Sequence, residues 1–237
     1  MLDVFSTSAY RQLPLSVRYA LVQGMRIPEA SPASLDDLTE EAFVVANRWT
    51  AEAIRTHPSI QSLEQIYRDL GYDDGAITPA AQSFIELLQK RGRFPRINTA
   101  VDAYNTIVAM SPALVGIGAH DADLIQSPVL FARATGAERF MPLGRTKPRA
   151  VKKGDFLYHD GHGNVLARLA AQDCDGAKIQ RDTRNVLLVI ESPTTIEKEI
   201  VRDVMEAACS RIVRFCGGDV VVVGEPRPAH EPRTTQS

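Results

Sequence analysis

At residues 93–105 the chain reads RFPRINTAVDAYN, and fifteen residues after the last of these, at residues 120–123, it reads HDAD. The first segment combines polar groups with apolar, helix-forming sequence, and the second adds an imidazole and two carboxylates. Such groups need buried partners or a ligand to offset their loss of hydration. These two segments therefore mark the place where a functional site is expected.

The first segment is predicted to form a helix whose apolar face carries Asn105. Thr99-x-x-Asp102 has the pattern of a capping box, in which polar side chains satisfy the free amide groups of the first turn. Residues three and four apart lie on one face of a helix. By this spacing, the face holds Val101, Tyr104, Asn105 and Val108.

Upstream of this segment, residues 34–91 are predicted to be a helical scaffold. Ser34 stands three residues before Asp37, which is a helix-start signal, and apolar residues follow at helical spacing. Thr78-Pro79 starts a further helix, with a capping residue and then a proline in the first turn, and Gly92 ends it.

From about residue 128 the chain changes to short apolar runs separated by turn residues, which is typical of strands. Asp160-Gly161 and Gly163-Asn164 lie between two of these runs and favour a hairpin. A long helix follows, on which apolar residues recur every four positions from Ile196 to Ile212 before Gly217-Gly218 ends it. The predicted strands are Val129–Ala132, Arg139–Leu143, Phe156–Tyr158, Val165–Leu169, Val186–Ile190 and Val220–Val223.

The composition excludes several classes of protein. The 237 residues hold 27 Lys and Arg against 29 Asp and Glu, so no overall basic field indicates nucleic-acid binding, and an RNA contact needs a local patch. Cys174, Cys209 and Cys216 are too few and too irregularly spaced for a disulfide framework or a zinc site, so we expect reduced thiols, no metal and no other cofactor. P-loop, dinucleotide-binding and Gly-x-Ser-x-Gly patterns are absent from the sequence.

We expect a soluble, cytoplasmic protein with no membrane partner. The N-terminal residues lack the pattern of a signal peptide, and no run approaches 18 continuous apolar residues. Residues 225–237 hold three prolines and no apolar periodicity, which predicts a disordered tail. The predicted organisation is a helical N-terminal part at residues 1–92 that packs with an α+β unit at residues 93–224.

His120 is the leading candidate for a functional side chain. It follows the run 115–119, in which Gly116, Gly118 and Ala119 allow the backbone to approach a ligand or to form a tight turn. An imidazole has an ordinary pKa of about 6.5 and suits proton transfer near neutral pH. Asp121 and Asp123 beside it have two interpretations, as caps of a following helix or as groups that contact a substrate.

Two basic runs are candidate phosphate-binding surfaces, against the alternative that they are ordinary solvated faces. The first run holds Arg145, Lys147, Arg149, Lys152 and Lys153, and the second holds Lys178, Arg181 and Arg184.

The sequence contains these motifs in order: Tyr67-x-x-Leu70-Gly71, Phe94-Pro95-x-Ile97-Asn98, Val101-Asp102-x-Tyr104-Asn105, Gly118-Ala119-His120-Asp121-x-Asp123, Gly154-Asp155-Phe156-Leu157-Tyr158 and Thr183-x-Asn185-Val186-Leu187. Together they resemble the tRNA-editing B3/B4 domain of the bacterial phenylalanyl-tRNA synthetase β subunit, and more closely its free-standing relatives. The resemblance implies an α+β fold, with the helical N-terminal part packed on a mixed β-sheet domain, and no metal. It also implies hydrolysis of the ester of tRNA charged with the wrong amino acid.

The resemblance assigns roles to residues of this chain. His120 matches the editing-site histidine, and Asn105 matches the family's Asn in the preceding helix. The synthetases carry a pocket Glu where this chain has Val189. Glu191 lies two residues further on, which keeps the same face of a strand, so it is predicted to substitute for that carboxylate. The later Thr-containing motif of the synthetases has no counterpart in this sequence.

The implied reaction needs few groups, because an aminoacyl ester is already activated. Backbone amides at residues 116–119 would stabilise the oxyanion, His120 would orient water or ribose, and Glu191 or Asp123 would hold the α-ammonium. Two functions stay open. One is deacylation of mischarged aminoacyl-tRNA in trans, and the other is non-catalytic binding of a free amino acid or related small molecule in the inherited pocket. A weaker third is an interaction role alongside a synthetase.

Overall fold

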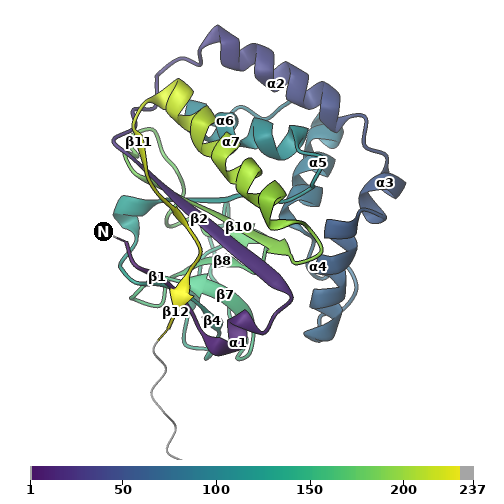
Figure 1. Ribbon diagram of the computed structural model, residues 1–237, viewed down its shortest axis with the longest axis vertical. Helices are drawn as coiled ribbons and strands as arrows, with labels where there is room; N and C mark the ends of the chain where they lie inside the picture. The colour runs from purple at the N-terminus through teal and green to yellow at the C-terminus, as the bar shows by residue number, and fades with distance from the viewer. Residues whose placement is uncertain (1, 230–237) are drawn as a thin grey trace, which may run out of the picture.

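The computed structural model describes residues 2–229 of the chain (Figure 1). None of the helices in this range is long and apolar enough to cross a membrane. The helices are α1 (Ser8–Arg11), α2 (Ala33–Ala46), α3 (Ala51–Arg55), α4 (Pro58–Asp69), α5 (Ala80–Arg91), α6 (Thr99–Met110) and α7 (Lys198–Cys216), with the short 3-10 helix η1 (Ala122–Leu124). The strands are β1 (Val4–Ser6), β2 (Leu15–Gln23), β3 (Gly118–Asp121), β4 (Val129–Arg133), β5 (Arg139–Phe140), β6 (Arg149–Ala150), β7 (Phe156–His159), β8 (Val165–Arg168), β9 (Gln172–Asp173), β10 (Val186–Pro193), β11 (Asp219–Gly224) and β12 (Arg227–Pro228).

Helices cover one face of a four-stranded antiparallel sheet with the strand order β11-β2-β10-β3. Helix α7 packs on β2 and β10, α6 packs on α7, and α2 packs on α6 (Figure 1). Val186, Leu188 and Ile190 of β10 are buried in the core between this sheet and the helices. Removing such apolar area from water is the main favourable contribution to folding.

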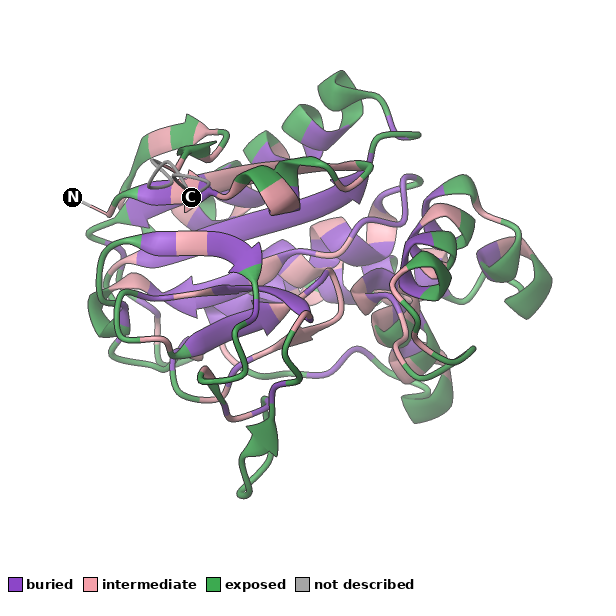
Figure 2. Ribbon diagram, turned by 90° about the horizontal axis from the view of Figure 1, so that it is seen from below, coloured by how far each residue is buried: buried purple, intermediate pink, exposed green. Residues whose placement is uncertain are grey.

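A second sheet lies on the other side of β10. It has six strands in the order β12-β1-β4-β7-β8-β9, and it is mixed, because β1 pairs in parallel with β4 and β12 while the remaining pairs are antiparallel. Leu187 and Val189 of β10 belong to the core on this side. In Figure 2 the buried strands occupy the middle of the molecule, with exposed segments around them. The predicted α+β class with a mixed sheet is confirmed.

The sequence analysis missed β1 and β2, which lie inside the part predicted to be helical. Strand β2 pairs with β10 along residues 15–22, and β11 pairs with its other side. Leu15, Val17 and Tyr19 alternate with Ser16 and Arg18, which is a strand pattern that the sequence analysis did not use. Pairing with two strands distant in sequence then fixes its place in the sheet. The division at residue 92 stays a prediction.

Several local predictions agree with the structure. Helix α5 ends at Gly92, whose φ of 63° is the left-handed conformation that glycine adopts without strain. Strands β7 and β8 form the predicted hairpin, and in its turn Asp160 Oδ1 accepts a hydrogen bond from the Asn164 amide at 2.9 Å. The strand predicted at Arg139–Leu143 is shorter. Strand β5 covers only Arg139–Phe140, and beyond it the chain meets the β9 region through an isolated bridge between Pro142 and Cys174 and a hydrogen bond from the Leu143 amide to the Asp173 carbonyl.

The cap of α6 differs from the prediction. The helix begins at Thr99, but the side chain that accepts a hydrogen bond from the Val101 amide belongs to Asn98, at 3.0 Å. The carboxylate of Asp102 accepts from the Ile97 amide at 2.9 Å. The predicted pairing of Thr99 with Asp102 is therefore wrong, because the helix has its cap one residue earlier.

The predicted disordered tail starts too early. Arg227–Pro228 forms β12 beside β1, and the Ala229 amide donates to the Ser6 carbonyl at 2.9 Å. The backbone of β1 supplies the hydrogen bonds that composition alone does not reveal. The rest of the predicted tail, residues 230–237, lies outside the described residues.

Candidate functional site

One cavity of about 640 Å³ brings together residues from both sheets and from helices α5 and α6. Its wall is largely apolar, with a small number of polar side chains, which is the usual make-up of a small-molecule site. The polar and charged side chains among its lining residues are Ser83, Arg91, Tyr104, Asn105, Tyr158, Gln172, Asp173 and Glu191.

The predicted helix face of α6 lines this cavity. Val101, Tyr104, Asn105 and Val108 are all among its lining residues, because they share one side of the helix. Gly116 and Gly118 also line it, whereas His120 and Ala119 do not.

Glu191 lines the cavity from β10, on the same face as Val189. The Tyr10 hydroxyl donates a hydrogen bond to its Oε1, and the Ala170 amide donates to its Oε2 at 2.7 Å. Burial raises the pKa of Glu191, and these two donors oppose the rise. Ala170 has a φ of 49°, an unfavourable conformation for a residue other than glycine, at a position where its amide meets the carboxylate.

His120 lies one layer behind the cavity wall. Its side chain is fully buried, and its Nε2 lies 2.7 Å from the hydroxyl of Tyr158, which does line the cavity. Burial lowers the pKa of His120 to about 3, so the imidazole is neutral near pH 7. Nδ1 has no hydrogen-bond partner among residues 2–229. His120 is therefore placed to act on a ligand through the Tyr158 hydroxyl and not by direct contact.

The sequence analysis missed Asp173, the second carboxylate of the cavity. Its side chain is 24% exposed, and its Oδ2 accepts a hydrogen bond from the Ala119 amide at 3.3 Å. Burial, with a smaller contribution from the negative charge of Glu191, raises the pKa of Asp173 to about 7. No local sequence signal distinguishes this residue, because its neighbours are polar and lack periodicity. Tyr158, in contrast, stands at the end of a motif that the resemblance had already singled out.

Gly118 is required by the close approach of these groups. A Cβ atom at this position would lie 2.7 Å from the Tyr158 hydroxyl and 3.1 Å from Asp173 Oδ1, both shorter than ordinary van der Waals contact. The backbone of β3 thus comes near the two polar groups because residue 118 has no side chain.

We expect Gly118→Ala to lower the free energy of unfolding by about 1–3 kcal/mol, because a methyl group is inserted into an already packed site. Urea unfolding measures the change. Gly176→Ala is the matched control, since a Cβ at Gly176 meets nothing within 4 Å. Equal effects of the two substitutions would show that Tyr158 and Asp173 can move aside without cost.

Asp121 and Asp123 accept hydrogen bonds from other groups of the chain and do not line the cavity. Asp121 Oδ1 accepts from the Asp123 amide at 3.0 Å, and its Oδ2 accepts from the Thr183 hydroxyl at 2.5 Å. Asp123 accepts from the Asn185 side chain at 2.6 Å. Of the two interpretations of Asp121, the structure agrees with the helix cap, because this residue caps η1.

The first basic run begins at the rim of the cavity. Leu143 is a lining residue, and residues 143–150, which begin with it, are all exposed. We call residues 143–150, which end in strand β6, the arm. Arg145, Lys147 and Arg149 lie in this segment, and Lys152 and Lys153 are exposed just beyond it.

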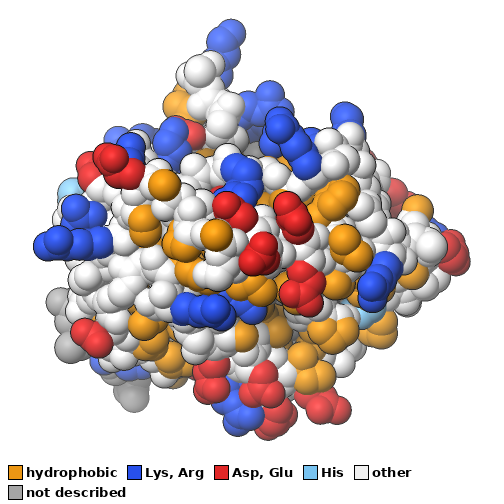
Figure 3. All heavy atoms as spheres, turned by 90° about the horizontal axis from the view of Figure 1, so that it is seen from above, with side chains coloured by type: hydrophobic (Ala, Val, Ile, Leu, Met, Phe, Trp, Pro, Cys, Tyr) orange, Lys and Arg blue, Asp and Glu red, His pale blue; other side chains and the backbone are white. Residues whose placement is uncertain are grey.

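The second basic run is partly neutralised by neighbouring acids. Lys178 pairs with Asp175 at 2.9 Å, and Arg181 pairs with Glu29 at 2.8 Å, whereas Arg184 is exposed. On the face seen in Figure 3, basic and acidic side chains are likewise interspersed. The first run is therefore the stronger candidate for contact with phosphate groups.

The model of one protein family, described as the B3/4 domain, matches residues 73–217. The chain belongs to the B3/4 domain family. The predicted resemblance to a B3/B4-type domain is thereby confirmed. The matched B3/4 region extends from α5 to α7 and includes Asn105, His120, Asp173 and Glu191, while Tyr10 lies outside it.

Among solved structures, this B3/4 protein is similar to an N-terminal fragment of the phenylalanyl-tRNA synthetase β-subunit from Pyrococcus horikoshii. The sequence identity is 18% and the TM-score is 0.49. The alignment covers 92% of this chain and 50% of that one, so the chain spans about half the length of the fragment. A comparison with curated proteins found no match.

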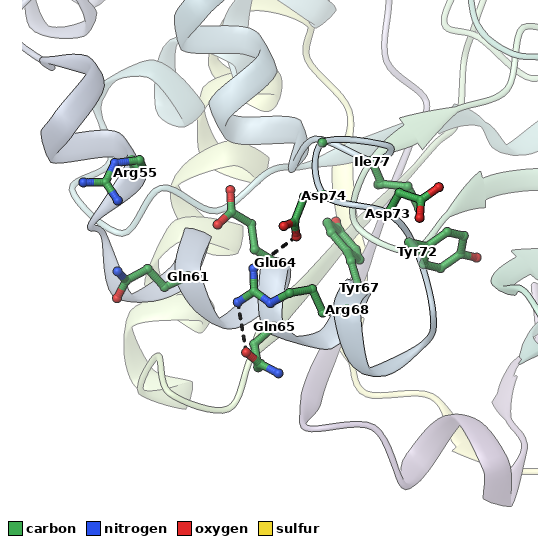
Figure 4. Close-up of a pocket in the computed structure, with 11 residues that line it drawn as sticks. Arg55, Gln61, Glu64, Gln65, Tyr67, Arg68, Tyr72, Asp73, Asp74 and Ile77 are labelled. Atoms are coloured by element: carbon green, nitrogen blue, oxygen red, sulfur yellow. Dashed lines mark hydrogen bonds and ion pairs between the residues drawn. The ribbon is translucent and has the colours of Figure 1, made fainter.

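A second hollow of the B3/4 protein, about 550 Å³, lies between α4 and the loop before α5 (Figure 4). One ion pair joins two of its charged lining residues. Arg68 lies 3.7 Å from Asp74 and donates to Gln65 at 2.9 Å. No predicted site residue lines it, and in residues 2–229 no cluster of three His, Cys, Asp or Glu side chains is arranged to hold a metal ion.

Proposed function

We propose that this protein is an editing-type domain that hydrolyses the ester of mischarged aminoacyl-tRNA in trans. The observation that carries the proposal is the single cavity in which an apolar wall faces the carboxylates of Asp173 and Glu191. An apolar amino-acid side chain fits the wall, and a carboxylate suits the α-ammonium group. The exposed basic residues next to the rim suit the phosphates of a tRNA.

In the proposed reaction, water attacks the ester carbonyl and the bond to the ribose oxygen breaks. Glu191 accepts a proton from the attacking water and returns it to the leaving ribose oxygen, while Asn105 orients the water. Burial raises the pKa of Glu191, which brings the carboxylate closer to the value that general base catalysis requires near neutral pH. His120 acts by holding the Tyr158 hydroxyl.

A second candidate function is non-catalytic binding of an amino acid or related small molecule in the same cavity. The buried position of His120 favours it, because a neutral imidazole that does not line the cavity cannot itself take a proton from a bound water. This candidate needs neither the basic arm nor a proton acceptor.

Deacylation assays distinguish the two functions. Purified protein is incubated with a panel of tRNAs that carry cognate or non-cognate labelled amino acids, and release is followed over time. We expect release from at least one mischarged tRNA and a fall in kcat of about 100-fold or more in Glu191→Gln, which is typical for loss of general base catalysis. The double variant Arg145→Glu and Lys147→Glu, which reverses two charges proposed to contact phosphates, should raise the KM for the charged tRNA and leave kcat nearly unchanged.

Arg202→Glu is the control for charge, because Arg202 lies on α7, away from the arm, and pairs with Asp203. A protein that binds amino acids but releases none from any charged tRNA would overturn the editing proposal in favour of the binding module.

A further inference from the structure

The two carboxylates of the cavity differ in what they already bind. Both oxygens of Glu191 accept hydrogen bonds from the protein, from Tyr10 and from Ala170. Asp173 has one donor, the Ala119 amide, and that donor binds Oδ2. Oδ1 has no hydrogen-bond donor among residues 2–229, and His120 Nε2 lies 3.9 Å from it. Because His120 is neutral, Asp173 has no positive partner there.

A largely buried carboxylate of this kind is costly unless a cation pairs with it. Arg91 is the single Lys or Arg side chain among the residues that line the cavity, and no ion pair joins it to Asp173 in the described part of the chain. Gly118 has no side chain to cover Oδ1, whereas a Cβ at this position would lie 3.1 Å from it. The missing partner of Asp173 is thus a group that a ligand would bring.

We propose that Asp173 is the receptor for a ligand ammonium group, and that the cavity accepts amines whose carboxyl group is esterified, amidated or absent in preference to free amino acids. The proposal rests on the proposed function and deepens it by naming the binding residue and the form of the substrate. It moves the ammonium contact from Glu191 or Asp123 to Asp173.

The preference against free amino acids follows from the charges. A free amino acid carries a carboxylate as well as an ammonium group, and in this cavity it would meet the negative charges of both Asp173 and Glu191. Like charges in a partly desolvated site repel one another strongly. An ester or amide removes that negative charge and keeps the ammonium group.

Calorimetric titration of the full chain tests the inference without tRNA. The probes combine an apolar group with different charges: 2-phenylethylamine and 3-methylbutylamine at pH 8, and phenylalaninamide and phenylalanine at pH 7, below the ordinary α-amino pKa of about 7.7 to 8.0, so that the amide carries an ammonium group. We expect at least one of the two simple amines to bind, and phenylalaninamide to bind at least tenfold more tightly than phenylalanine. Asp173→Asn should weaken binding of the amine at least tenfold, whereas Asp175→Asn, which removes a carboxylate that pairs with Lys178, should not.

Lowering the pH to 5.5 should weaken amine binding more than tenfold, because protons then compete for Asp173, whose pKa is about 7. The alkyl ammonium probes keep their charge over this range, as a lysine side chain does. Besides the neutral His120, the titratable groups near Asp173 are Glu191, Cys174, Tyr104 and Tyr158. Burial raises the pKa of the Cys174 thiol and of both phenols, so Glu191 is the other candidate in this pH range, and the experiment is repeated with Glu191→Gln to identify which carboxylate titrates.

Failure of every amine to bind, equal affinity for phenylalanine and its amide, or unchanged amine binding in Asp173→Asn would each overturn the inference. Asp173-dependent amine binding without any deacylation would overturn the editing function alone. Deacylation that is unaffected by Asp173→Asn would overturn the inference alone.

Discussion

Asp173→Asn is expected to raise the free energy of unfolding at pH 8 by about 2 to 4 kcal/mol. The same variant loses the carboxylate proposed to bind the ligand ammonium group. The physical reason is the raised pKa of Asp173, about 7 in the folded protein against an ordinary value of 3.8. Each pKa unit corresponds to about 1.36 kcal/mol of preference for the neutral form, and the partial exposure of the side chain reduces the total. Asparagine resembles that neutral form.

The sign of the pH dependence follows from the same shift. Between pH 3.8 and 7 the Asp173 carboxyl binds more protons in the folded protein than in the unfolded chain. The charged carboxylate therefore lowers the free energy of unfolding more as the pH rises, and this effect is constant above about pH 7. The advantage of Asp173→Asn should therefore be largest at pH 8, smaller at pH 5, and absent below pH 3.8. Urea unfolding at these three values measures it.

Asp175→Asn is the matched control. Lys178 lowers the pKa of Asp175, so that carboxylate is stabilised in its charged form and its loss should not stabilise the protein. A lower stability of Asp173→Asn at pH 8 would show that the charge of Asp173 already has a partner in the folded chain, and it would remove the physical basis for a ligand cation there. Gain of stability with loss of binding is the pattern expected of a functional residue.

Tyr10→Phe is expected to lower the free energy of unfolding by about 1–3 kcal/mol at pH 8, because it leaves one oxygen of the buried Glu191 without a donor. The loss of that donor should raise the pKa of Glu191 further. Protonation then occurs more readily in the folded variant, so the deficit relative to wild type should shrink as the pH falls from 8 to 5.

Tyr19→Phe is the control for Tyr10→Phe, because it removes a hydroxyl with no hydrogen bond to Glu191. Carboxyl NMR of labelled Glu191 in both variants follows the titration directly. A pKa of Glu191 that is the same in Tyr10→Phe as in wild type would contradict the proposed role. The result also tests whether α1, which precedes the matched B3/4 region, positions a side chain of the cavity.

The local sequence of α6 determined much of the candidate site. Apolar residues at helical spacing placed Asn105 on the same face as Val101 and Tyr104, and all three line the cavity. The two-residue step of a strand likewise placed Glu191 on the face of Val189. These predictions succeed because helix and strand periodicities depend only on neighbours along the chain.

Pairings between distant segments decided the rest. Residues 15–19 of β2 alternate apolar and polar side chains, but only the pairing with β10 and β11 decides where this strand lies in the sheet. His120 was predicted to face a ligand. In the structure it pairs with Leu187, which is buried between the two sheets, and its ring therefore contacts the Tyr158 hydroxyl. A sequence pattern predicts on which face of an element a residue lies, but not what covers that face.

The sequence by itself determined the family, the α+β class and the side chains of α6 and β10 that line the cavity, because these depend on ordered motifs and local periodicity. Only the tertiary structure decided which carboxylates share the cavity and how each is partnered. Asp173 comes from a two-residue strand with no periodic signal, and the donors of Glu191 come from positions 10 and 170. The charge state of a buried group depends on every element packed around it, and that environment forms only when the chain folds.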